Sequence, residues 1–142
     1  MTDRAKAIHE YIFDHKDDFL SYLRFLVEEE TPSDKPSTFS NIQNRLRASF
    51  EELSFNVEYI EGEETAGQLV CKPDDFNPEA PSQLILGHID TVWDLGTLED
   101  MPFKIDGNIV SGPGIFDMKT GICMMVFAMR AVCTIEETPS VQ

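Results

Sequence analysis

The sequence predicts an α/β fold, because segments with helical periodicity alternate with short strand-like runs. The helical segments cover 4–29, 38–53 and 118–133. The strand-like runs cover 55–60, 68–72, 84–86 and the two arms of 103–110. Apolar residues recur at helical spacing in the first set, and they alternate with polar residues or form a short continuous run in the second. Alternation of this kind along the chain is typical of α/β proteins rather than of all-α or all-β ones.

The first predicted helix, over residues 4–29, places apolar residues on one face with charges between them. These apolar residues are Ile8, Ile12, Phe19, Leu20, Leu23, Leu26 and Val27. We expect a bend near Asp14–Asp18, and Thr31-Pro32-Ser33-Asp34 ends the segment. A second helix over 38–53 follows Pro36, which marks a loop and a new start.

The second half of the chain has a different character. The continuous apolar run Leu84-Ile85-Leu86 is typical of a strand covered on both faces in a parallel or mixed sheet. Asp106-Gly107, between two short alternating runs, is the strongest hairpin signal in the sequence. A Met- and Phe-rich helix follows over 118–133.

Length and charge restrict the classes of protein that the chain could represent. Its 142 residues suffice for one domain at most. It has 26 acidic and 11 basic residues, a formal net charge of −15, and no Lys/Arg cluster that would neutralise phosphates. We therefore expect neither nucleic acid nor an anionic membrane as a partner. No secretory signal is visible and the longest apolar run, 122–129, is too short to span a bilayer, which predicts a cytoplasmic protein.

The first candidate site is Gly87-His88-Ile89-Asp90-Thr91, directly after the predicted buried strand. Ligands of open α/β sheets bind beyond the carboxyl ends of strands, where His88 falls. His88 and Asp90 share a face if the segment is extended, so their side chains can touch. A carboxylate that accepts one imidazole N–H directs the other nitrogen outward, which suits either a metal ligand or a general base. A histidine that merely ends a strand has the same pattern.

The second candidate site is Asp117, which follows Gly112-Pro113-Gly114 at the entry of the last helix. The carboxylate could face the same crevice as His88, or it could simply cap the helix. A phosphate-binding loop is excluded, because Pro113 and Met118 occupy the two glycine positions that precede Lys119-Thr120 in such a motif.

Three stretches taken together are far more specific than either candidate alone. They are Leu-Ile-Leu-Gly-His-Ile-Asp-Thr-Val-Trp, Met-Pro-Phe-Lys-Ile-Asp-Gly and Gly-Pro-Gly-Ile-Phe-Asp-Met-Lys. In this order the sequence resembles the zinc-dependent exopeptidases and deacylases, a family that includes glutamate carboxypeptidases, aminoacylases, acetylornithine deacetylases and succinyl-diaminopimelate desuccinylases. The resemblance is strongest over 84–128, and the linking segment is most similar to the glutamate carboxypeptidase branch.

The resemblance implies a fold and a set of residue roles. The fold would be a three-layer α/β/α catalytic domain with a mixed sheet, of which residues 1–142 form the N-terminal portion without the lid and dimerisation domain. His88 would bind one zinc ion, Asp117 would bridge two, and Asp90 would be the catalytic-site residue that orients His88. The resemblance also implies a cis peptide between Asp117 and Met118. A complete member would hold two zinc ions, whereas this chain would hold one or none well.

The function that follows is metal-dependent hydrolysis of an amide bond by a metal-activated water. The substrate would be a small peptide, with release of a C-terminal amino acid such as glutamate. An N-acyl amino acid deacylase of the same family and a non-catalytic metal-binding module are the alternatives. In the family the general base precedes a further ligand in an adjacent glutamate pair. Glu136-Glu137 lies too early to serve, so we expect the 142-residue chain alone to be inactive and the full-length protein to be a possible homodimer.

Overall fold

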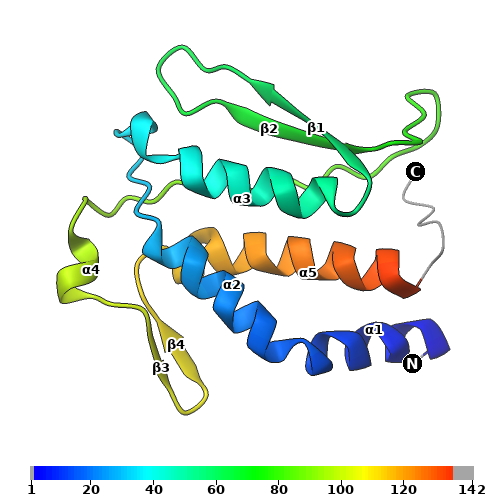
Figure 1. Ribbon diagram of the computed structural model, residues 1–142, viewed down its shortest axis with the longest axis horizontal. Coiled ribbons are helices and arrows are strands. Elements are labelled where there is room, and N and C mark those ends of the chain that lie inside the picture. Colours follow the sequence, from blue (N-terminus) through cyan, green and yellow to red (C-terminus); the bar gives the residue numbers. More distant parts are fainter. Residues whose placement is uncertain (1, 136–142) are drawn as a thin grey trace.

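The computed structural model describes residues 2–135, which form helices and two small sheets (Figure 1). The N-terminal half contains α1 (Asp3–Asp14), α2 (Lys16–Glu28), a short 3-10 turn η1 (Pro36–Thr38), α3 (Ser40–Glu51), β1 (Phe55–Ile60) and β2 (Gln68–Pro73). The C-terminal half contains α4 (Thr97–Asp100), β3 (Lys104–Asp106), β4 (Ile109–Ser111), a turn η2 (Ile115–Lys119) that is kinked at Asp117 and Met118, and α5 (Thr120–Ile135). The mixture of helices and strands confirms the α/β class.

The core lies between α2, α3 and α5, with α1 packed beside α5 (Figure 1). Its fully or almost fully buried side chains are Tyr22, Leu23, Leu26 and Val27 of α2, Ile42 and Leu46 of α3, and Ile122, Cys123, Val126 and Phe127 of α5. Their helical spacing places them on one face of each helix, as the sequence predicts. Each fully buried aliphatic or aromatic side chain contributes about 1.5–3 kcal/mol relative to an exposed one. These three helices therefore form the platform for the loops that precede and follow them.

The break between α1 and α2 confirms the expected bend. α1 ends at Asp14 and α2 begins at Lys16, with His15 between them. The His15 ring stacks on Tyr11 with ring centroids 4.0 Å apart, and its Nδ1 lies 2.8 Å from the Tyr11 carbonyl oxygen.

The two sheets are antiparallel ribbons of two strands each. β1 pairs with β2 from Phe55 opposite Pro73 to Ile60 opposite Gln68, and this ribbon covers α3 (Figure 1). β3 pairs with β4 as the predicted hairpin, with Gly107 at a positive φ of 59° in its turn. Glycine suits that turn because side chains disfavour the left-handed region.

The prediction of a buried strand at 84–86, and with it a mixed sheet, is wrong for the part of the chain that the structure describes. Leu84, Ile85 and Leu86 form no strand and are 80%, 57% and 75% exposed. Among residues 2–135 the only parallel pairing is a single bridge between Pro32 and Thr91. A parallel strand needs neighbours brought beside it by distant parts of the chain, and no described strand lies next to this segment. The three-layer arrangement is therefore not seen in the described residues.

The last predicted helix, over 118–133, is confirmed as α5 (Thr120–Ile135), with its bounds shifted by two residues. Together with the turn before it, the segment Ile115–Ile135 is long and apolar enough to cross a membrane by length and composition, although the backbone of Asp117 and Met118 is non-helical. A core helix passes the same test, and α5 buries five residues against its neighbours.

Cys123 is the most deeply buried of the three thiols. It is fully buried, its Sγ lies 3.5 Å from the Phe19 carbonyl oxygen, and burial raises its pKa to about 12, against a small opposing effect of Arg130. Thiolate is the reactive form, so we expect iodoacetamide to modify Cys133, which is half-buried, well before Cys123. Peptide mass spectrometry of the native chain measures this order. In denaturant, where both thiols are exposed, Cys123 and Cys133 should be labelled at equal rates. Equal rates in the native chain would contradict the predicted order.

Candidate metal centre

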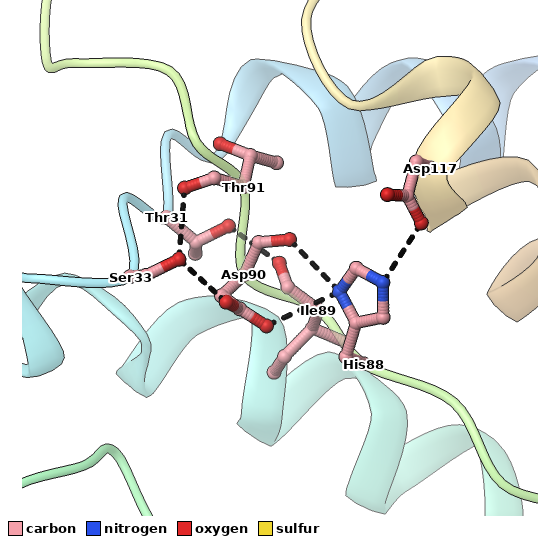
Figure 2. Close-up of polar contacts among 7 residues, drawn as sticks. All are labelled: Thr31, Ser33, His88, Ile89, Asp90, Thr91 and Asp117. Carbon is pink, nitrogen blue, oxygen red and sulfur yellow. Dashed lines mark hydrogen bonds and ion pairs between the residues drawn. The ribbon is translucent and has the colours of Figure 1, made fainter.

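His88 is positioned by the loop that follows α2 rather than by a sheet. The Thr91 amide donates to the Thr31 carbonyl at 2.8 Å, and the Ser33 amide donates to the Thr91 carbonyl at 3.0 Å. The buried Thr31 hydroxyl adds a bond to the Ile89 carbonyl at 2.6 Å. These three bonds hold the segment that begins with His88 in an extended conformation beside Thr31–Ser33 (Figure 2).

Asp117 is brought to the same place by a glycine that permits close approach. Gly114 adopts a φ of 70°, and its carbonyl accepts the Lys119 amide at 2.9 Å. A Cβ on Gly114 would lie 2.5 Å from Thr91 Cγ2, which is a clash. Only glycine therefore fits where the loop before Asp117 packs on the His88 segment.

The three predicted residues form one contiguous polar cluster (Figure 2). His88 Nε2 lies 2.9 Å from Asp117 Oδ1. On the other side of the ring, His88 Nδ1 lies 3.2 Å from Asp90 Oδ1 and 3.1 Å from the Asp90 carbonyl oxygen. The expected facing of His88 and Asp117, with Asp90 within reach of His88, is confirmed. The expected cis peptide between Asp117 and Met118 is also present.

Both ring nitrogens of His88 face oxygen acceptors only, which fits the doubly protonated ring. Burial by itself would lower the pKa of His88, but the hydrogen bond to Asp117 and the contacts with Asp90 outweigh it and raise that pKa. The side chains remain open to solvent, at 45% exposed for His88 and 79% for Asp117. A ligand can therefore reach the atoms that face one another.

A pocket of about 330 Å³ opens over this cluster. Its lining joins the polar residues to apolar and aromatic ones. The lining residues are His88, Asp90, Thr91, Val92, Trp93, Gly112, Gly114, Ile115, Phe116 and Asp117. The volume is sufficient for a small ligand beside the His88–Asp117 pair.

Two further residues that contact the site were not predicted from the sequence. The Ser33 hydroxyl donates to Asp90 Oδ2 at 2.6 Å, although its sequence context predicts only the end of a helix. Lys119, 1% exposed, donates from Nζ to the Glu29 carbonyl oxygen at 2.6 Å. Nothing in the sequence indicates that this lysine would be buried or that it would contact the end of α2.

The loop that leads into α4 is also held by a residue just after the end of α2. The Glu30 carboxylate accepts the amides of Gly96 at 2.9 Å and Leu98 at 3.1 Å, at the start of α4. Residues 29–33 thus contact the segment that carries His88, the start of α4 and Lys119, which follows Asp117 in the chain.

The donor atoms present suit a divalent metal ion. An imidazole nitrogen whose ring is held by a carboxylate, facing a second carboxylate, is a common arrangement around zinc. Among residues 2–135 no group of three or more His, Cys, Asp or Glu side chains forms a complete shell. His88 and Asp117 therefore fit as two ligands of a metal site. The acidic pair Glu136-Glu137, considered in the sequence analysis as a general base, lies outside the described residues.

Such a carboxylate–histidine–carboxylate cluster at a pocket in an α/β domain is typical of metal-dependent hydrolases. Residues 84–140 match the model of Peptidase family M20/M25/M40, a family of peptidases and amidohydrolases. The predicted resemblance to the exopeptidases and deacylases is thereby confirmed over these residues, and all three site residues lie within the matched segment.

Two curated proteins are similar to most of the chain. Carboxypeptidase G2 of Pseudomonas sp. (strain RS-16) is 24% identical over 133 residues, which are 89% of this chain and 31% of that protein. The N-formyl-4-amino-5-aminomethyl-2-methylpyrimidine deformylase of Halalkalibacterium halodurans is 28% identical over 123 residues, which are 83% of this chain and 29% of that protein. The chain therefore spans about a third of the length of these relatives.

Proposed function

We propose that this chain forms the metal-binding part of a zinc-dependent hydrolase of amide bonds, acting on a small peptide or an N-acylated amino acid. The observation that carries the proposal is the contact of His88 with Asp117 on one ring nitrogen and with Asp90 on the other. Both similar proteins have names that denote hydrolysis of a C–N bond, one a carboxypeptidase and the other a deformylase.

The residues of the chain have distinct tasks in this proposal. Asp90 accepts the Nδ1 proton of His88 and so keeps Nε2 directed at the pocket. Asp117, which has two carboxylate oxygens, would hold metal together with His88 and could contribute one oxygen to each of two ions. When bound, zinc would lower the pKa of a water molecule and polarise the carbonyl group of the substrate.

The carboxypeptidase and the deacylase remain two versions of this proposal. Release of a C-terminal amino acid such as glutamate is supported by the similarity to carboxypeptidase G2. Removal of a small acyl group is supported equally by the similarity to the deformylase. A matched pair of substrates, an N-formyl amino acid and a dipeptide with the same C-terminal residue, separates the two by their relative rates.

The test uses the protein at the full length that its gene encodes, stripped of metal and reloaded with zinc. We expect zinc-dependent release of the free amino acid, lost in His88→Ala and Asp117→Asn and retained in His9→Ala, a histidine on the exposed side of α1. The 142-residue chain alone should show no turnover, because general acid–base catalysis is worth about 10²–10⁴-fold and no base is placed at the pocket by the described residues. Turnover that persists without metal or in His88→Ala would contradict the proposal.

A further inference from the structure

Ser33 lies on the loop that follows α2, and its side chain contacts Asp90, the carboxylate that holds His88 (Figure 2). Its Oγ lies 2.6 Å from Asp90 Oδ2, a short hydrogen bond to a charged acceptor. The same Oγ lies farther from the Thr91 carbonyl oxygen, at 3.2 Å. A hydroxyl has one proton, so the carboxylate is its main acceptor.

The two oxygens of Asp90 are thus divided between two partners. Oδ2 accepts from Ser33, and Oδ1 lies 3.2 Å from His88 Nδ1. The Asp90 side chain is 39% exposed, so without the hydroxyl it is free to rotate towards water. Fixing one oxygen therefore fixes the direction in which the other meets the imidazole ring.

We propose that Ser33 is a positioning residue of the metal site, which orients Asp90 and through it directs His88 Nε2 towards a divalent cation. The inference rests on the proposed function, since it concerns the same site. It adds a residue outside the matched segment 84–140, on the loop that follows α2.

The main-chain contacts make this role separable from folding. The Ser33 amide and the Thr31 backbone and hydroxyl hold the Ile89–Thr91 backbone independently of the Ser33 side chain. Removal of the Ser33 hydroxyl therefore leaves these bonds in place. The expected change is in the orientation of a carboxylate rather than in the position of the loop.

The experiment measures Zn²⁺ affinity by titration calorimetry and the visible spectrum of bound Co²⁺ for four forms of the chain. These are the unmodified chain, Ser33→Ala, Ser33→Thr and Ser21→Ala. Ser21 serves as the control because it lies on α2 and its hydroxyl donates to the Asp17 carbonyl oxygen. Partners that orient a ligating histidine are typically worth 10–100-fold in metal affinity. We expect Ser33→Ala to bind about 10-fold more weakly with an altered Co²⁺ spectrum, Ser33→Thr to restore both, and Ser21→Ala to change neither.

The outcomes distinguish this inference from the proposed function. Equal affinity and spectrum in Ser33→Ala and the unmodified chain would overturn the inference, provided that His88→Ala reduces binding. Failure of Ser33→Thr to restore them would overturn it as well, because the hydroxyl would not be the cause. Binding that is unaffected by His88→Ala would instead remove the metal site itself, and the proposed function with it.

Discussion

Replacement of His88 by alanine is expected to weaken zinc binding by the chain about 100-fold. Structural zinc sites bind with roughly 10–16 kcal/mol from four ligands, so one ligand is worth about 2–4 kcal/mol. At 1.4 kcal/mol for each tenfold change, this loss corresponds to a factor of about 100. Since the described residues supply two ligands and water must supply the rest, the starting affinity should be below that of a zinc site with four protein ligands.

The measurement is a calorimetric titration of the metal-free chain with zinc, at an ionic strength that screens the surface. Screening matters because a net charge of −15 attracts divalent cations without specificity. His9→Ala provides the matched control, since it removes an imidazole far from the pocket on α1. Indistinguishable affinities for the unmodified chain and His88→Ala would show that the bound zinc lies on the acidic surface.

The parts of the fold that could be predicted are those encoded by neighbouring residues. Helical periodicity placed α2, α3 and α5 because their apolar faces pack on one another in the finished structure. The Asp106-Gly107 turn was predictable because its backbone conformation depends on the turn residues themselves. The strand predicted at 84–86 is wrong for the opposite reason, because an apolar run does not determine whether a neighbouring strand is present to pair with it.

The same distinction between local and distant interactions applies to the candidate site. His88, Asp90 and Asp117 were predictable because their chemistry is unusual and their local motifs are distinctive. Their contact across 29 residues, His88 Nε2 to Asp117 Oδ1, depends on how two loops pack, and the family resemblance provided that. Ser33 and Lys119 were missed because a hydroxyl in a loop and a lysine at a helix start have no property that marks them as supports. Their roles arise only from contacts with distant residues.

Lys119→Ala is expected to be among the most destabilising single changes in the chain, at about 2–5 kcal/mol of unfolding free energy. The Lys119 side chain is almost fully buried and its ammonium donates to the Glu29 carbonyl, at the C-terminal end of α2. A cation is favoured at this end of a helix, where the dipole is negative. Truncation removes that donor and also leaves a cavity, and both effects are costly in a buried site.

Lys119→Met separates these two effects, because methionine retains most of the volume without the charge. It should lose less stability than Lys119→Ala, since no large cavity forms and the cost of burying an ammonium disappears. Lys104→Ala is the control, on an exposed lysine of β3, and should stay within about 0.5 kcal/mol of the unmodified chain. Denaturant unfolding measures all three, and a loss for Lys119→Ala no larger than that for Lys104→Ala would contradict the structural role.

The pH dependence of the same variants tests the state of the buried ammonium. Burial lowers the pKa of Lys119 from 10.5 to about 8, against the opposing effect of Glu29 and Glu30. Between these two values the unfolded chain binds more protons at Lys119 than the folded chain, so this group makes stability rise with pH. Below about pH 8 both states are protonated and the cost of the buried charge is fully present.

The unmodified chain should therefore gain stability relative to Lys119→Met as the pH rises from about 8 towards 10.5. Groups that titrate in both forms, such as Tyr22, cancel in this difference. The comparison consequently isolates the contribution of Lys119 to stability. This contribution rises with pH, whereas that of a lysine held by a strong ion pair would fall. A difference that stays constant or falls over this range would show that the Lys119 ammonium is not buried at a cost in free energy.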